Sequence, residues 1–306
     1  MKQDIETFAY TAGYVDGDGC FYIGTYRTKK CTIYEASIQI LSVKKPVLEF
    51  FQSFFGGFIR QKAKRINQKI PFVWSIKGFD AACVAINIKQ YLIDKSYSCT
   101  CFIDYVANIK KSNYQKVSDE DIYFRNKQIE NIRRDRHMSN FVTKELIESI
   151  KGSEKTVKPI NTDFIYLAGL IDAEGCFRIK KWKPKNKPNH VYAINLEIGN
   201  TKFPIIPWLV ERFGGSVTFV PAKTRKKASA LWSLSAKSLF EILSKLHPYL
   251  RTKKPICEKL IEFQSTIIPN GGDRHSELFH SLFSKTLARR ESIVNEIHAL
   301  NSKGSN

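Results

Sequence analysis

Two short stretches of this chain are nearly the same, and this duplication constrains its fold more than any other feature. Residues 11–24 read TAGYVDGDGCFYIG and residues 167–180 read LAGLIDAEGCFRIK. An acid, Asp18 or Glu174, stands at the same place in each copy. At an offset of 156 the copies share Ala12/Ala168, Gly13/Gly169, Asp16/Asp172, Gly19/Gly175, Cys20/Cys176, Phe21/Phe177 and Ile23/Ile179. The pattern predicts two half-sites that meet in one functional site.

The similarity extends well beyond the short motif. In each half, alternating apolar and polar runs are separated by helical patterns in the order helix, strand, strand, helix, strand, strand, helix. Landmarks recur at an offset of 158: Phe55-Gly56-Gly57/Phe213-Gly214-Gly215, Trp74/Trp232, Leu92/Leu250 and Lys95/Lys253. Four short strands of period two favour an antiparallel sheet with one face on helices and one face exposed. The sequence therefore predicts an α+β fold of two pseudo-symmetric units.

The expected domain boundaries follow from the repeat. The N-terminal unit covers residues 1–116 and the C-terminal unit covers 161–267. Residues 117–160 are polar, and we expect them to form a linker with one helix near 143–151. Residues 268–306 have no match in the first unit and are expected to form a helical extension, whose role the sequence does not indicate.

The strong positive charge points to a polyanionic partner. The chain carries 49 Lys and Arg against 29 Asp and Glu, for a formal net charge of +20. On a chain that is apolar enough to fold, this excess indicates nucleic acid more than mere solubility. No apolar run approaches the roughly 18 residues of a spanning helix, and the N-terminus lacks a signal-peptide pattern. We therefore expect no membrane partner.

The seven cysteines lack metal-ligand spacing and are typical of reduced thiols in an intracellular protein.

The motif itself predicts a helix interface with a metal site at its end. If residues 5–17 and 163–173 are helices, small residues four positions apart let their backbones approach closely. The acids Asp18 and Glu174 then fall at the helix C-termini, where carbonyls lack partners and the helix dipole is negative. Carboxylate and carbonyl oxygens suit Mg²⁺. A capping or turn role is the alternative for either acid alone, but duplication in register favours the metal site.

These residues resemble the signature of the LAGLIDADG homing endonucleases, in the form that carries two repeats in one chain. The resemblance covers most of residues 1–111 and 161–267, although Thr11 stands where the family usually has Leu. It implies αββαββα units whose motif helices form the interface and whose saddle-shaped sheets lie in the major groove of DNA. The interface positions are then Ala12, Gly13, Asp16, Ala168, Gly169 and Asp172.

The resemblance also implies roles for particular residues. Asp18 and Glu174 would bind the metal, and the carbonyls of Gly17 and Ala173 would complete its coordination. Lys95 and Lys253 match basic active-site residues of the family. Ser42 and Asn200 end the second strands, where a polar residue often orients water, although Ser42 is an atypical choice.

The reaction implied by the resemblance is hydrolysis of one phosphodiester in each DNA strand across the minor groove, leaving short 3′ overhangs. Mg²⁺ would support it, Mn²⁺ would substitute, and Ca²⁺ would bind without supporting cleavage. The target would be long and asymmetric, because the two strand faces differ. One chain already holds two half-sites, so we expect a monomer, and the resemblance implies an intron-encoded protein.

Strand alternation identifies the residues that face DNA. If Phe21, Ile23, Phe177 and Ile179 point to the core, their neighbours point outward. Such residues include types that read base edges in the major groove. They are Tyr22, Tyr26, Thr28, Lys30, Glu35, Ser37, Gln39, Arg60 and Lys62 in the first unit and Arg178, Lys180, Trp182, Asn195 and Glu197 in the second.

Two other functions remain open on the sequence. One is a maturase that binds group I intron RNA, which a basic surface suits equally. The other is an inactive DNA-binding regulator on the same fold. Both acids and both lysines are present, and this favours the endonuclease.

The excess of lysine over arginine hints at an AT-rich genome, so we expect the protein in an organelle matrix or stroma, or in a bacterial cytoplasm.

Overall fold

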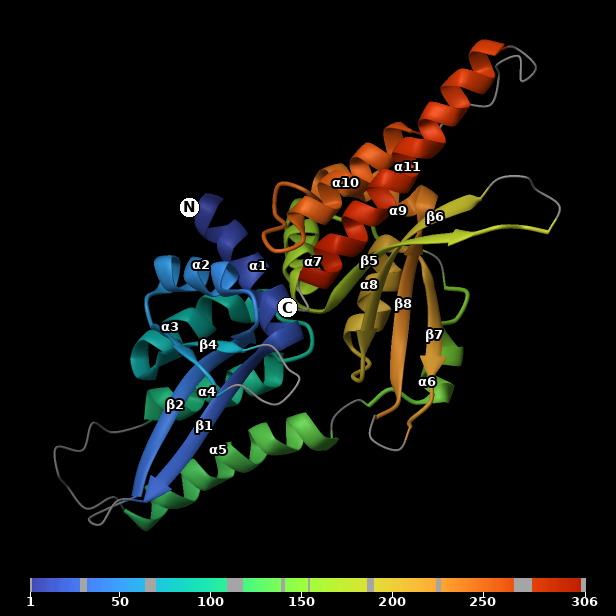
Figure 1. The fold of residues 1–306 in the computed structure, drawn as a ribbon. Helices are drawn as coiled ribbons and strands as arrows, with labels where there is room; N and C mark the ends of the chain where they lie inside the picture. The colour runs from blue at the N-terminus through green and yellow to red at the C-terminus, as the bar shows by residue number, and fades with distance from the viewer. Residues whose placement is uncertain are drawn as a thin grey trace.

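The computed structural model describes residues 2–27, 32–63, 70–108, 118–138, 141–153, 155–185, 190–223, 227–266 and 277–303. Two units of similar architecture pack through a central helix pair (Figure 1). The first unit contains α1 (Lys2–Asp18), β1 (Gly19–Arg27), β2 (Thr32–Ser42), α2 (Lys45–Phe55), β3 (Phe58–Gln61), β4 (Phe72–Lys77), α3 (Gly78–Ile88), the 3₁₀ turn η1 (Lys89–Tyr91) and α4 (Ser96–Asn108). The second contains α7 (Asn161–Glu174), β5 (Gly175–Trp182), β6 (Val191–Asn200), α8 (Ile205–Phe213), β7 (Ser216–Val220), β8 (Ser229–Ser235), α9 (Ala236–Leu246) and α10 (Lys254–Ser265). The predicted α+β fold class is confirmed.

Each unit has one antiparallel sheet, ordered β1-β2-β4-β3 in the first and β5-β6-β8-β7 in the second. The registers correspond, since Phe21 lies opposite Ile38 and Phe177 lies opposite Leu196. All four of these side chains are buried. One face of each sheet therefore packs on helices, as the period-two pattern predicts.

The tryptophans fix the same turn in both units. Trp74 and Trp232 are fully buried, and their Nε1 atoms donate to the carbonyls of Gly56 at 2.9 Å and Gly214 at 2.7 Å. Those glycines have φ of 76° and 68°, a region that L side chains rarely adopt. The Gly-Gly pair after each second helix is thus explained by the turn that accepts the indole.

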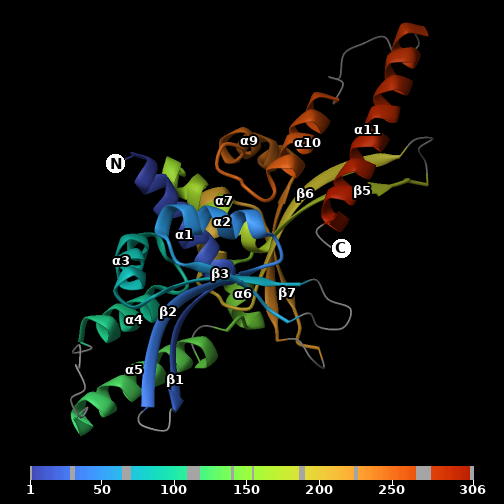
Figure 2. The same cartoon turned by 60° about the vertical axis from the view of Figure 1, so that its left-hand side comes forward.

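Helices α1 and α7 pack backbone against backbone at the centre of the molecule (Figure 2). A Cβ on Gly13 would lie 2.0 Å from the carbonyl oxygen of Tyr166, and one on Gly169 would lie 2.0 Å from that of Tyr10. The close approach predicted from the small residues therefore occurs at both symmetry-related positions.

The linker contains a helix that the sequence did not predict. Besides α6 (Lys144–Ile150), it forms α5 (Asp119–Met138), which lies beside β1 and β2 (Figures 1 and 2). Among the side chains of α5 that the structure describes, only a narrow stripe is buried, through Arg125, Ile129, Ile132 and Asp135. The rest of α5 is strongly polar, so its few apolar residues do not give a recognisable helical pattern in the sequence.

The extension forms α11 (Glu277–Lys303), which packs on α10. Of its side chains with a described placement, Ile293, Val294 and Ile297 are buried. Within the described part of the chain, no helix has the length and apolar character to cross a membrane.

Candidate active site

The two motif acids stand at adjacent helix ends. Asp18 is the last residue of α1 and Glu174 is the last residue of α7. A Cβ on Gly17 would lie 2.5 Å from the Cβ of Ala173 and 3.2 Å from the Cγ of Glu174. The tight glycine contact along the helix pair therefore brings the two acids to one place.

The environment of Asp18 disfavours its negative charge. Removal from water raises the pKa of Asp18 from 3.8 to about 6, and the nearby charge of Glu174 adds to this, while Lys95 and Lys253 oppose it. The helix C-terminus is also the negative end of the dipole. A cation at this point would offset the removal from water, the repulsion from Glu174 and the unfavourable helix dipole.

Asp16 and Asp172 are fully bonded and tie four segments together. The Asp16 carboxylate accepts from the backbone N–H groups of Ile93 at 2.8 Å, Asp94 at 3.2 Å and Lys95 at 2.9 Å. It also accepts from the hydroxyl of Tyr166 on the opposing helix at 2.7 Å. Asp172 repeats this arrangement with Arg251, Thr252, Lys253 and the hydroxyl of Tyr10. Each aspartate therefore holds a lysine-bearing loop to its own motif helix and contacts the other motif helix.

The two lysines contact the carbonyls at the ends of the motif helices. Lys95 Nζ donates to the carbonyls of Val15, Asp16, Gly17 and Gly19 at 2.7–3.2 Å. Lys253 Nζ donates to those of Ile171 and Asp172. Burial lowers the pKa of Lys95, and it lowers that of Lys253 to about 8. Their ammonium groups thus cap carbonyls that lack helical partners, beside the acids.

A pocket of about 420 Å³ lies between the units and contains several of the predicted residues. Gly17, Lys95, Glu174 and Asn200 line it, whereas Asp18, Ser42, Lys253 and Ala173 do not. Its full lining is Asp16, Gly17, Asp94, Lys95, Glu174, Gly199, Asn200, Thr201, Lys202 and Ser229.

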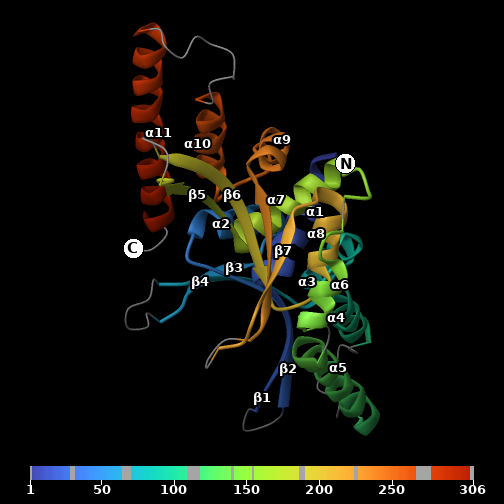
Figure 3. The same cartoon turned by 90° about the vertical axis from the view of Figure 1, so that its right-hand side faces the viewer.

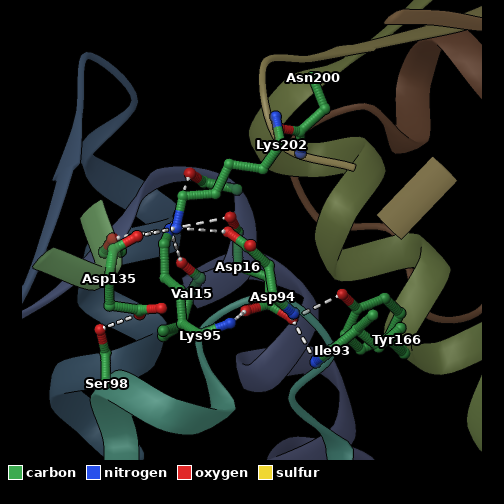
Figure 4. Close-up of polar contacts among 12 residues, drawn as sticks. Val15, Asp16, Ile93, Asp94, Lys95, Ser98, Asp135, Tyr166, Asn200 and Lys202 are labelled. Atoms are coloured by element: carbon green, nitrogen blue, oxygen red, sulfur yellow. Dashed lines mark hydrogen bonds and ion pairs between the residues drawn. The ribbon is translucent and has the colours of Figure 1, made fainter. Parts of the chain in front are cut away.

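Sequence reasoning missed Lys202 and Asp94 in this pocket. Lys202 Nζ lies 3.5 Å from the Asp94 carboxylate and donates to the carbonyl of Asp135 at 3.2 Å, so it joins the two units and the linker (Figure 4). Burial raises the pKa of Asp94 above its ordinary value, and Lys202 opposes this. The sequence signal that could have identified Lys202 is that Lys44 occupies the matching position in the first repeat, at the same offset of 158.

The symmetry-related pocket, of about 360 Å³, has a different chemistry. Lys44 stands at the counterpart of Lys202, but Thr252 replaces Asp94. Arg251 also lines this pocket, with its guanidinium over the Phe50 ring at 3.4 Å. The two half-sites are therefore chemically unequal.

Ser42 and Asn200 both close the turn that follows their strands. The Ser42 hydroxyl accepts from the backbone N–H of Lys44 at 3.1 Å, and the Asn200 side-chain oxygen accepts from that of Lys202 at 2.8 Å. Their matching positions thus reflect a shared turn, which is one physical reason for a polar residue at each place.

The predicted DNA-reading residues are partly accessible. Tyr22, Arg60, Lys62, Arg178, Lys180 and Trp182 are exposed, although Lys62 lies just beyond the end of β3. Glu35 and Gln39 are half-buried. Thr28 and Lys30 lie outside the described residues, as does the side chain of Tyr26.

Three of these predictions need correction. Ser37, Asn195 and Glu197 lie on the expected strand face but are buried rather than exposed. They sit on β2 and β6, which have a strand on each side, so side chains of two neighbouring strands surround each position. The Glu197 carboxylate in particular forms ion pairs with Arg178 at 3.2 Å and with Lys180 at 3.3 Å.

The donor set at the helix ends fits a hard divalent cation. It consists of two carboxylates, Asp18 and Glu174, at the ends of α1 and α7, with the preceding Gly17 carbonyl, which also accepts from Lys95 Nζ at 3.2 Å. Among the residues that the structure describes, no three His, Cys, Asp or Glu side chains converge as a metal cage. Such a sparse oxygen set suits Mg²⁺, which keeps several water ligands. Histidine and thiolate ligands of the kind that hold structural zinc are not part of this donor set.

Comparison with solved structures shows the fold. The chain is similar to I-SmaMI bound to an uncleaved DNA target in the presence of calcium, with a TM-score of 0.64 and 15% identity over 95% of this chain and 98% of that one. It is similar to I-AabMI bound to uncleaved DNA, with a TM-score of 0.61 and 19% identity over 96% and 97%. It is also similar to I-GzeII in complex with a DNA target, with a TM-score of 0.62 and 15% identity over 93% of this chain and 97% of that one.

Sequence comparison gives the family. No curated protein matches the chain. The model of the LAGLIDADG endonuclease family, however, matches residues 11–116 and again residues 167–268. These ranges span both repeats, from the motif helices to the last helix of each unit. The chain therefore belongs to the LAGLIDADG endonuclease family, as a member with two repeats.

Proposed function

We propose that this protein is a site-specific endonuclease that cuts both strands of a long, asymmetric duplex DNA target. The observation that carries the proposal is the meeting of Asp18 and Glu174, one from each repeat, at the ends of two helices in backbone contact. Two half-sites that share one centre match two scissile phosphates on opposite strands. Membership of the family and the DNA-bound relatives support the same conclusion.

Asp18 and Glu174, with the Gly17 carbonyl, would hold Mg²⁺. When bound, the ion neutralises phosphate charge, activates water and stabilises the leaving oxygen. Asp16 and Asp172 hold in place the loops that carry Lys95 and Lys253, because each aspartate accepts from the backbone N–H of its lysine. These lysines add positive charge beside the phosphates, which favours the more negative transition state.

Recognition would come from the exposed strand faces. Tyr22, Arg60, Arg178, Lys180 and Trp182 offer hydrogen-bonding and apolar groups to base edges. The faces of the two units differ at most of these positions, so the target is expected to lack symmetry.

The test is cleavage of a library of randomised duplex DNA in Mg²⁺. We expect wild type to recover one asymmetric sequence with short 3′ overhangs, to bind it without cutting in Ca²⁺, and to cut it in Mn²⁺. A protein that binds one duplex sequence but never cuts it would instead be a regulator. One that prefers no duplex and binds structured intron RNA would be a maturase.

A further inference from the structure

Helix α11 lies along the outside of the β5–β6 hairpin and is bonded to it at two levels (Figure 3). Near its C-terminal end, Asn301 donates to the carbonyl of Phe177 at 3.4 Å. Farther out, the Glu291 carboxylate accepts from the Tyr192 hydroxyl at 2.7 Å and from Lys181 Nζ at 2.5 Å. Lys181 and Tyr192 lie opposite each other in the strand register. One carboxylate of α11 therefore holds both strands of the hairpin.

Helix α5 takes the same place in the first unit. Its Arg125 guanidinium lies over the Tyr34 ring at 5.0 Å, and Tyr34 is the counterpart of Tyr192 at the offset of 158. In α11, Arg290 lies over Phe263 at 5.7 Å. Phe263 packs edge-on against Tyr192, and its counterpart Tyr105 is buried beside Tyr34 and Arg125.

The packing positions of the two helices also correspond. Each helix uses an arginine followed by two branched apolar residues at the same spacing, and each residue lies 165 positions from its partner: Arg125/Arg290, Ile129/Val294 and Ile132/Ile297. The sequence analysis found no match for residues 268–306 within residues 1–116, and the counterpart of α11 lies beyond them, in the segment expected to be a linker. The match was hidden because the offset changes from 158 to 165 and both helices are mainly polar.

We infer that the duplicated unit is one helix longer than αββαββα, and that α11 is a brace that positions the outer part of the β5–β6 hairpin for base recognition. The inference rests on the proposed function. A two-stranded hairpin is marginally stable on its own, so its outer end needs support to present side chains in a fixed place. Lys181 follows Glu174 by seven residues, about 23 Å along the strand. At 3.4 Å per base pair, this is about seven base pairs from the cut.

The experiment compares Glu291→Ala with Glu296→Ala in the full chain. Glu296 lies on the same helix and also has two charged partners, Lys259 at 2.6 Å and Arg289 at 3.1 Å, but these lie on α10 and α11. Tyr192→Phe serves as a milder variant that removes only the hydroxyl. For each protein, amide hydrogen exchange of β5 and β6 is measured without DNA, and the randomised-library selection is repeated.

We expect Glu291→Ala to speed exchange in Ile179–Trp182 and Val191–Ile194 by about tenfold, which is the effect of losing a charge-assisted hydrogen bond. Base preference should weaken only at positions about seven base pairs from the cut, in one half-site. Tyr192→Phe should shift both readouts in the same direction, and Glu296→Ala should shift neither.

Equal exchange in the two alanine variants would overturn the inference. Faster exchange with unchanged base preference, or a uniform loss of preference along the site, would also overturn it. If wild type recovers no sequence, the proposed function fails, while the exchange comparison still decides whether α11 braces the hairpin.

Discussion

Asp16 and Asp18 are two residues apart on one helix, yet their surroundings give them different tasks. Asp16 is buried and accepts four hydrogen bonds, so its charge is satisfied and it holds structure together. Asp18 stands at the helix end beside Glu174, and partial removal from water together with the Glu174 charge raises its pKa. The acid that is poorly compensated is the one that a cation would stabilise.

The titration of Asp18 gives the first prediction. In the metal-free protein its carboxyl should titrate near pH 6, and Glu174→Gln should lower that pKa while leaving it above 3.8, because burial is the larger cause. Since the folded pKa exceeds the ordinary value, ionising Asp18 destabilises the fold. Its contribution to stability is therefore greatest below pH 3.8 and is lost as the pH rises through about 6. Carbon-13 NMR of the carboxyl measures this, and a wild-type pKa near 3.8 would contradict it.

The second prediction concerns Asp16. Asp16→Ala leaves three backbone N–H groups and the Tyr166 hydroxyl without their acceptor, so the free energy of unfolding should fall by roughly 3 kcal/mol or more. Asp104→Ala removes an exposed carboxylate from the middle of α4 and should change it by less than about 0.5 kcal/mol. Urea unfolding of both variants gives the comparison. Similar values for the two would show that the Asp16 bonds are not important for the fold.

At the residue scale, the duplication was sufficient to predict that Asp18, Glu174, Lys95 and Lys253 lie near one another, because the acid and the lysine each occur twice in register. It could not reveal that Lys202 meets Asp94. That contact joins the end of one sheet to a loop of the other unit, and it depends on how the units pack. The repeat marks only the lysine, through Lys44 in the other half; Asp94 has Thr252 as its counterpart, so the repeat does not reveal the ion pair.

At the element scale, helices α1 and α7 decide the architecture. Their contact is backbone against backbone, which places the two acids together without any help from ligands. Small residues at a spacing of four made this predictable, since each glycine costs roughly 1 kcal/mol in a helix and so needs a packing reason.

The third prediction follows from that contact. Gly13→Ala would place a methyl group 2.0 Å from the backbone oxygen of Tyr166, and backbone cannot move aside as a side chain can. We expect a loss of at least about 3 kcal/mol in unfolding free energy, at the upper end for overpacking. Gly199→Ala is the matched control, because the nearest atom would lie at 3.9 Å. A Gly13→Ala protein as stable as Gly199→Ala would contradict the close helix contact.

The strands were predictable from alternation, but accessibility along them was not. Asn195 and Glu197 alternate with core residues, as expected of an outward face, yet the flanking strands bury them. Exposure depends on the side chains of neighbouring strands, which one strand's own pattern does not contain. Helix α5 was missed for a related reason: its narrow buried stripe includes a charged residue, Arg125.

At the scale of the whole molecule, the net charge of +20 is the dominant property. Lysines and arginines that contact phosphates release condensed counterions, so affinity for duplex DNA should fall steeply with salt. We predict a log–log slope on the order of −5 or steeper, measured in Ca²⁺ by fluorescence anisotropy. A flat dependence would argue against a nucleic-acid partner.

The central claim is that one acid from each repeat forms a single centre that cuts both strands. The direct test is a supercoiled plasmid carrying the recovered target, incubated in Mg²⁺ with wild type and with an Asp18→Asn/Glu174→Gln variant. We predict that wild type linearises the plasmid, and that the variant binds the target but cuts it at least about 1,000-fold more slowly, as expected when several kcal/mol of metal stabilisation are lost. Linear product from the variant at the wild-type rate would contradict the account.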